Sequence, residues 1–283
     1  MTQAIHNLPS GISLQLDGTP KRHGVVSLTT ADSQPNAVRE PYFLMNIYRV
    51  LADGKLWTVA RDEPFTTEPQ ENGLILHWQP TDTLPVEMRA TYQVQQDGSL
   101  TLELWIRAAA DLARFEISVS SYFDFAYEPY SVLDLGWQDG TKQKQLALWK
   151  AEDQPFVRGH YIHLSRDDQG TMTRMDGRWN NEAGISIAPA VYGPHYGQPV
   201  AAMAAEFDGE TITIVQSSQR ESCDGISLTY SSDNTSDNIR NHNALYFSLF
   251  GEDLKTGDER TALLRQSILR ESPSIENVLA AAL

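Results

Sequence analysis

The sequence predicts an all-β protein, a large antiparallel sandwich that ends in a short C-terminal helix. Three observations support this class. Apolar and polar residues alternate with a period of two in several runs, Asp-Gly pairs recur at short intervals, and helical patterns are scarce. Roughly a dozen or more strands are expected, which is more than one open sheet usually holds and therefore favours two packed layers.

The clearest strand is predicted at residues 100–107, which read Leu-Thr-Leu-Glu-Leu-Trp-Ile-Arg. Side chains two residues apart in a strand share a face, so the four aliphatic side chains point one way. Trp105 lies on the opposite, polar side, where a concave binding face would hold an aromatic ring. The same alternation is looser at residues 86–94, 114–123, 211–216 and 244–250.

Reverse-turn signals separate these runs. Asp-Gly occurs at 17–18, 53–54, 97–98, 139–140, 176–177, 208–209 and 224–225, and Asn-Gly occurs at 72–73. Both residues of such a pair adopt a positive φ at low cost, which suits the tight turns of hairpins. We therefore predict hairpins at residues 48–60, 91–107 and 201–216.

The C-terminal segment has the best helical pattern. Its Ser-Pro-Ser run can cap a helix, with Pro273 in the first turn. Elsewhere the strand–helix alternation of a parallel sheet is missing. We expect one domain over residues 1–283, with its core at about residues 20–270 and a helix or tail at 272–283.

Charge and composition restrict the function classes. Twenty-two Lys and Arg stand against 37 Asp and Glu, which gives a net charge of −15. Such a surface repels nucleic acid and anionic lipid but tolerates neutral ligands such as sugars. No signal peptide and no run of about 20 apolar residues is evident, so we expect a cytoplasmic protein. A chain whose leader had been removed would read the same way.

Several catalytic signatures are missing from the sequence. It contains no Gly-x-Gly-x-x-Gly fingerprint, no phosphate-binding loop and no Gly-x-Ser-x-Gly nucleophile elbow. Cys223 is the single cysteine, which rules out an intrachain disulfide and a cysteine-based zinc site. We expect it to be an inert core residue, and we expect neither a metal nor a cofactor.

Reactive residue types are densest between Arg158 and Trp179. His160 and His163 lie in an expected strand, where residues three apart point to opposite faces, so the two cannot share a metal ion without a bulge. One of them facing a cleft would serve as a general acid or base, because imidazole titrates near neutrality. The alternative is a structural, hydrogen-bonded histidine.

The segment Asp176-Gly177-Arg178-Trp179 is a second candidate. A carboxylate and a guanidinium bind sugar hydroxyls, and an indole stacks on a sugar ring. The alternative is an Asp-Gly turn with an exposed ion pair and a buried tryptophan.

Three further residues complete the set of candidates. His195 lies in a loop shaped by glycines and prolines, together with Tyr192 and Tyr196. Glu206 and Glu221 are candidate bases, although their distance from a histidine does not follow from the sequence.

The chain has an early arm at residues 39–43, strand pairs that include residues 73–78, 91–92, 99–103 and 115–125, and a closing Gly-Asp turn within residues 245–259. In this layout it resembles the galactose mutarotase-like superfamily. The resemblance implies a β-supersandwich over most of the chain, as in a divergent member, and a sugar bound in the concave sheet. Arg39 of the early arm is then expected to contact the substrate.

The resemblance transfers to individual residues only in part. Residues 119–125 match the family's Asn-His-x-Tyr-Phe/Trp-Asn-Leu segment, but Ser120 stands where the family has a substrate-binding histidine. The family's second histidine, an acid, would be His160 or His163, and its sugar-binding aspartate would be Asp176. Its glutamate base has no counterpart near residues 241–251.

Together these observations predict a carbohydrate-binding or carbohydrate-active protein, with aldose 1-epimerisation by a histidine acid and a carboxylate base as the first enzymatic hypothesis. A non-catalytic sugar-binding module and a relative of polysaccharide lyases or hydrolases are the alternatives. The expected catalytic residues are His160, His163 and Glu206. The expected substrate-binding residues are Arg39, Trp105, Asp176, Arg178, Trp179 and His195.

Overall fold

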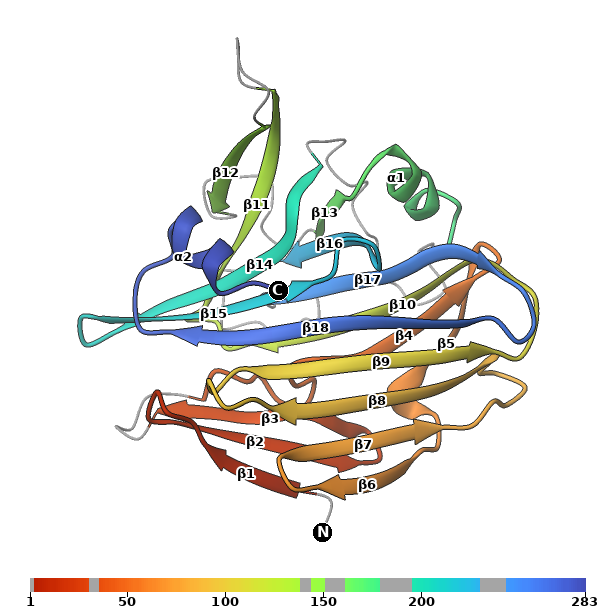
Figure 1. Ribbon diagram of the computed structural model, residues 1–283, viewed down its shortest axis with the longest axis horizontal. Helices are drawn as coiled ribbons and strands as arrows, with labels where there is room; N and C mark the ends of the chain where they lie inside the picture. Colours follow the sequence, from red (N-terminus) through yellow and green to blue (C-terminus); the bar gives the residue numbers. More distant parts are fainter. Residues whose placement is uncertain (1–2, 31–35, 138–143, 151–160, 179–194, 230–242) are drawn as a thin grey trace.

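The computed structural model describes residues 3–30, 36–137, 144–150, 161–178, 195–229 and 243–283. Within these ranges the chain forms antiparallel sheets of three, six and nine strands (Figure 1). The predicted all-β, antiparallel class is therefore confirmed.

The strands are arranged in the following spatial order. The three-stranded sheet contains β1 (Gln3–Asn7), β2 (Ile12–Thr19) and β3 (Arg22–Thr30). The six-stranded sheet contains β13 (Tyr161–Ser165), β16 (Cys223–Thr229), β17 (Asn243–Leu254), β10 (Leu112–Phe123), β4 (Asn46–Ala52) and β5 (Lys55–Val59). The nine-stranded sheet contains β12 (Lys144–Lys150), β11 (Glu128–Trp137), β14 (Tyr196–Phe207), β15 (Glu210–Ser218), β18 (Glu259–Leu269), β9 (Leu100–Ala108), β8 (Val86–Val94), β7 (Gly73–Trp78) and β6 (Thr66–Gln70).

The three predicted hairpins are confirmed as the pairs β4–β5, β8–β9 and β14–β15. Two of their turns use the predicted dipeptide with a positive φ at both residues: Asp53-Gly54, with φ of 56° and 70°, and Asp208-Gly209, with φ of 51° and 82°. This is the backbone that a two-residue hairpin turn requires.

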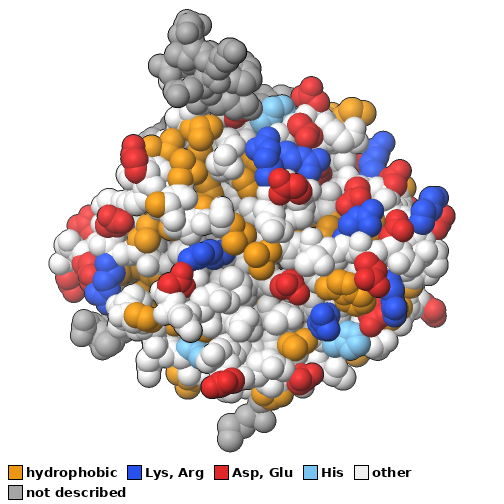
Figure 2. All heavy atoms as spheres, viewed as in Figure 1, with side chains coloured by type: hydrophobic (Ala, Val, Ile, Leu, Met, Phe, Trp, Pro, Cys, Tyr) orange, Lys and Arg blue, Asp and Glu red, His pale blue; other side chains and the backbone are white. Residues whose placement is uncertain are grey.

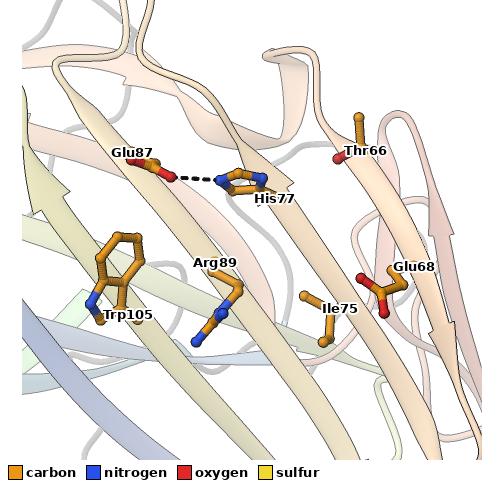
Figure 3. A pocket seen from close by; sticks show the side chains of 7 residues that line it. All are labelled: Thr66, Glu68, Ile75, His77, Glu87, Arg89 and Trp105. Carbon is orange, nitrogen blue, oxygen red and sulfur yellow. Dashed lines mark hydrogen bonds and ion pairs between the residues drawn. The ribbon is translucent and has the colours of Figure 1, made fainter.

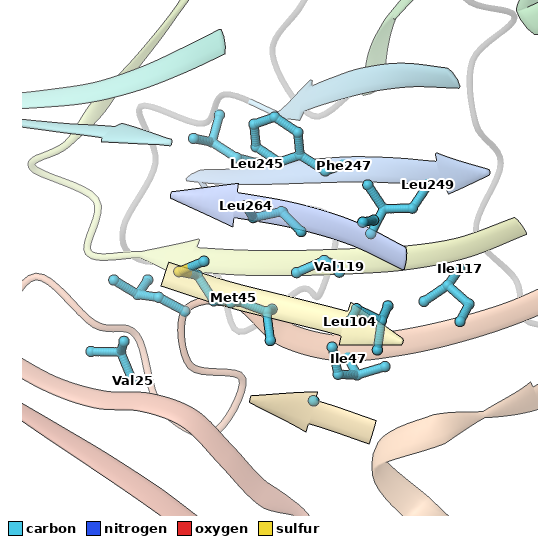
Figure 4. Packing of buried hydrophobic residues seen from close by; sticks show 14 of the residues in the cluster. Val25, Met45, Ile47, Leu104, Ile117, Val119, Leu245, Phe247, Leu249 and Leu264 are labelled. Carbon is cyan, nitrogen blue, oxygen red and sulfur yellow. The ribbon is translucent and has the colours of Figure 1, made fainter. Parts of the chain in front are cut away.

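The core lies between the six-stranded and nine-stranded sheets. Leu104 and Leu264 of the larger sheet pack against residues of the smaller one, including Ile117, Val119 and Phe247 (Figure 4). The same apolar cluster takes in residues of the three-stranded sheet, such as Val25. That sheet lies beside β6 and β7 (Figure 1), where the Thr67 hydroxyl donates to the Gly18 carbonyl.

Short helices complete the described chain: a 3-10 turn η1 (Ala60–Asp62), α1 (Asp168–Arg174) and α2 (Ile275–Ala280). The predicted C-terminal helix is thus confirmed, although its start differs from the prediction in one respect. Ser274 is the N-cap and forms a capping box with Asn277, so Pro273 precedes the helix and does not occupy its first turn. None of the helices in the described ranges is long and apolar enough to cross a membrane.

Gly24 in β3 lies where this strand comes close to the backbone of Leu44. Its φ is +100°, and a Cβ built there would lie 2.3 Å from the Leu44 carbonyl oxygen. Gly257 also has a positive φ, +91°, but a Cβ there would meet nothing within 4 Å.

We expect Gly257→Ala to lower the free energy of unfolding by about 1 kcal/mol, through backbone strain alone. Gly24→Ala adds a steric overlap with fixed backbone, so it costs a further ~1–3 kcal/mol. Urea unfolding of both variants measures the difference. Equal losses would contradict the close approach of β3 to the segment that contains Leu44.

Candidate functional site

The inner strands of the six-stranded sheet, β4, β10, β17 and β16, are largely buried on both faces. In β10, Phe115, Ile117 and Val119 belong to the core cluster. Because side chains alternate along a strand, Ser118 and Ser120 point to the opposite face. Both serines are nevertheless fully buried, with 0% of their surface exposed. The outer face of this sheet is therefore polar and shielded, whereas such a face usually meets solvent.

We term this surface the polar face. It comprises Glu116, Ser118, Ser120 and Tyr122 of β10, Tyr246 and Ser248 of β17, Ser227 of β16, His163 of β13, and Tyr48 and Arg49 of β4. Each of these residues is at most 6% exposed.

The strand register aligns the polar face into rows. In one row, Ser120 of β10 faces Tyr246 of β17, Tyr246 faces Ser227 of β16, and Ser227 faces His163 of β13. The Nδ1 atom of His163 lies 2.8 Å from the Ser227 hydroxyl, within hydrogen-bonding distance. The imidazole is thus fixed on this face by its neighbouring strand.

The His163 ring occupies the space beside Gly225, where the Cβ of any larger residue would overlap it. A Cβ at residue 225 would lie 2.3 Å from Cε1 and 2.6 Å from Nε2 of His163. Gly225 belongs to the predicted turn dipeptide Asp224-Gly225, but it lies within β16 and pairs with Ser165 and Ser248. Its function here is close packing and not chain reversal.

Two serine hydroxyls of the polar face have no hydrogen-bond partner among the residues that the structure describes. These are the Oγ atoms of Ser118 and Ser120. A buried hydroxyl without a partner costs about 1–3 kcal/mol, so native proteins usually satisfy such groups with protein, water or a ligand. The two serines are successive residues on this side of one strand, and they mark the place on the face where a ligand has hydrogen bonds to gain.

A buried group of charges borders these serines. The Arg178 guanidinium donates to both carboxylate oxygens of Asp176, at 2.9 and 2.7 Å, and to Oε2 of Glu116, at 3.1 Å. The side chains of Arg178 and Glu116 are 0% and 1% exposed. The predicted Asp-Gly turn is present, with a φ of +97° at Gly177, but its ion pair is buried, unlike in the exposed alternative.

The contacts between Arg178 and its carboxylate partners favour the charged forms of both Asp176 and Arg178. Burial alone would raise the pKa of Asp176, but the hydrogen bonds and the positive charge of Arg178 hold it below its ordinary value. Burial likewise opposes the charge on Arg178, yet its two carboxylate partners raise the pKa of the guanidinium. Asp176 is therefore ionised at neutral pH and is a weak proton acceptor.

Aromatic rings and arginines close one end of the polar face. The Tyr122 ring packs on Tyr246 at 5.7 Å and on Tyr42 at 4.8 Å between centroids. The Arg61 guanidinium lies 5.1 Å from the Tyr42 ring and 4.6 Å from the Tyr48 ring. These contacts join the early arm and η1 to the sheet.

The structure brings three of the predicted site residues to the polar face, namely His163, Asp176 and Arg178. Arg39 lies at its aromatic end, where its backbone N–H donates to the Tyr122 carbonyl and its guanidinium stacks 4.0 Å from the Phe125 ring. His160 and Trp179 lie outside the described residues.

The remaining predicted residues lie elsewhere. Trp105 and Glu206 belong to the nine-stranded sheet, and Glu206 is exposed near the end of β14. His195 lies at the surface, where its Nε2 atom is 3.3 Å from the Asp168 carboxylate. The structure therefore does not bring Trp105 together with Arg178, nor Glu206 together with His163.

The thiol of Cys223 is fully buried, and burial raises its pKa to about 12, so it is not a nucleophile. Among the residues described, no group of three or more His, Cys, Asp or Glu could hold a metal ion.

Sequence reasoning missed Glu116, Ser118, Ser227 and the tyrosines. The loose alternation at residues 114–123 contained a usable signal, since its even positions are polar or aromatic while its odd positions are mainly apolar. No sequence pattern indicated that Glu116 pairs with Arg178, which lies 62 residues further along the chain.

The fold is that of the galactose mutarotase-like proteins. The solved structure of galactose 1-epimerase from Lactobacillus acidophilus superposes with a TM-score of 0.52 and 8% identity, over 95% of this chain and 94% of that one. An aldose epimerase homologue from C. elegans is also similar, with a TM-score of 0.48 and 11% identity, over 95% of this chain and 100% of that one. No protein-family model and no curated protein matches the sequence.

Removing Arg178 tests the buried charge group. Arg178→Met removes the cation that binds the Asp176 carboxylate and the buried Glu116 carboxylate, so we expect a loss of about 3–5 kcal/mol in the free energy of unfolding. The matched control is Arg260→Met, because Arg260 also binds a carboxylate, Glu252, through two contacts of 3.0 Å, but both side chains are partly exposed.

The control variant should lose no more than about 1 kcal/mol. Chemical denaturation monitored by circular dichroism gives both values. Losses of similar size in the two variants would mean that the Glu116–Arg178 pair is not shielded from water.

Proposed function

We propose that the protein binds a carbohydrate on the polar face. The observation that carries this proposal is the pair of buried hydroxyls of Ser118 and Ser120, which have no hydrogen-bond partner within the described part of the chain. A sugar hydroxyl both donates and accepts hydrogen bonds, so one sugar can satisfy both serines. The ring of Tyr246, in register with Ser120, offers an apolar surface for the C–H groups of a sugar.

Two further findings support a sugar as the ligand. The fold is shared with a galactose 1-epimerase, a protein that acts on a sugar. In the resemblance to that family, Ser120 stands at the position of a substrate-binding histidine, and Ser120 belongs to the polar face.

Aldose 1-epimerisation at this face is the second candidate function. It is favoured by His163, an imidazole held on the same face by Ser227. Epimerisation also needs a base, and Arg178 binds both oxygens of Asp176 and one oxygen of Glu116, the carboxylates that border the polar face. Binding without proton transfer is therefore our first proposal.

Titration calorimetry with D-galactose, D-glucose and their oligosaccharides tests the binding. In the double variant Ser118→Ala, Ser120→Ala we expect affinity to fall about tenfold, from the loss of two hydrogen bonds of about 0.5–1.5 kcal/mol each. Stability should stay the same or rise, because two unsatisfied hydroxyls are removed.

The control for this test is Ser131→Ala, since Ser131 is also fully buried but donates to the Val200 carbonyl of the nine-stranded sheet. It should keep full affinity and lose stability. Binding that is equally strong in the double variant, or no binding of any sugar in the panel, would reject the proposal.

Polarimetry of freshly dissolved aldoses tests the second candidate separately. A rate above that of buffer that is lost in His163→Gln would support epimerisation. If galactose or another sugar binds but its mutarotation is not accelerated, the protein is a binding module and not an epimerase.

A further inference from the structure

A separate pocket of about 340 Å³ lies on the outer surface of the nine-stranded sheet, whereas the polar face belongs to the six-stranded sheet. Figure 3 shows its lining side chains, which include Trp105, Arg89 and Ile75, rising from β7, β8 and β9. We term it the outer pocket. The space-filling view shows acidic and basic side chains interspersed over this side of the molecule (Figure 2).

The outer pocket is built by strand register. His77 of β7 faces Arg89 of β8, and Arg89 faces Trp105 of β9. The neighbours of these residues along each strand, such as Met88 and Leu104, are buried in the core. Trp105 is therefore an aromatic side chain on the solvent side of an alternating strand, where it does not contribute to the core.

The charged groups of the outer pocket are paired, with one exception. Glu87 accepts hydrogen bonds from Arg107 and, at 2.9 Å, from His77, and these bonds keep the pKa of Glu87 below its ordinary value. Glu68, at the far side of the pocket, accepts from the side chain of Gln70 at 2.8 Å. Both carboxylates, Glu68 and Glu87, therefore already accept hydrogen bonds from neighbouring side chains.

Arg89 is the exception. Its guanidinium lies 5.9 Å from the centre of the Trp105 ring, and the described residues place no carboxylate within ion-pair distance of it. The side chain is exposed, and in Figure 3 it extends between Trp105 and Ile75. A guanidinium offers five donors in a planar fork that matches a carboxylate.

We propose that the outer pocket is a second binding site, for a carboxylate-bearing sugar ring of an acidic saccharide. The ring would stack its C–H face on the Trp105 indole, and its carboxylate would pair with the Arg89 guanidinium. Its hydroxyls would donate to Glu68, which lies on the other side of Arg89 from Trp105. A largely polar lining with one indole suits a sugar better than an apolar ligand.

This site is independent of the sugar site proposed on the polar face. The two surfaces belong to different sheets, and no residue is shared between them. The double variant Ser118→Ala, Ser120→Ala should therefore bind the acidic saccharide as the unmodified protein does, so the failure of one proposal leaves the other standing.

The test uses tri-galacturonic acid as the probe and its neutral methyl ester as the matched ligand, with titration calorimetry on the full chain. We expect the acid to bind at least tenfold more tightly than the ester. Trp105→Ala and Arg89→Gln should each weaken binding of the acid about tenfold or more, and Arg89→Gln should remove the preference for the acid over the ester.

The control variant is Arg265→Gln. Arg265 pairs with Thr101 on the same side of the same sheet, but its guanidinium is bound to Asp97 at 2.5 Å and lies outside the outer pocket. It should bind the acid normally. Unchanged thermal unfolding of the Trp105 and Arg89 variants shows that both are folded.

The proposal is overturned by no binding of the acid, by equal binding of acid and ester, or by binding that survives Trp105→Ala and Arg89→Gln. An equal loss of binding in Arg265→Gln would also overturn it, because the effect would then follow from the loss of any arginine on this surface.

Discussion

Burial of the inner strands of the six-stranded sheet on both faces is the constraint on which the candidate site depends. One face packs apolar side chains such as Ile117 and Phe247 against the nine-stranded sheet. The other face buries hydroxyl, imidazole and charged groups, and each of these must find a partner or lose its hydration energy. Most find one within the protein, whereas the hydroxyls of Ser118 and Ser120 find none in the ranges that the structure describes.

The buried Arg178 has a structural consequence as well as an electrostatic one. It ties the segment after α1 to the middle of β10 through Glu116, so the turn at Asp176 and the polar face form a single unit. Because the same guanidinium binds both oxygens of Asp176 and keeps its pKa below the ordinary value, Asp176 is poorly suited to proton abstraction. A ligand that competed for Arg178 would have to replace strong, charge-assisted hydrogen bonds.

The fold was largely accessible from the sequence, because local rules determine it. Alternation at residues 100–107 and turn dipeptides such as Asp53-Gly54 and Asp208-Gly209 act over a few residues, and the predicted hairpins form there. The site was accessible only in part. His163, Asp176 and Arg178 stood out by residue type, but the partner of Arg178 depends on how distant strands are paired. Trp105 was correctly expected on a polar strand face, but the sheet to which that face belongs is a property of the whole topology.

The central claim is that the polar face accommodates a sugar against Ser118 and Ser120. A crystal structure of the protein soaked with D-galactose tests it most directly. The account predicts ligand oxygens within about 3 Å of both serine Oγ atoms. Galactose bound only at other surfaces, with the two hydroxyls satisfied by protein atoms, would contradict the account.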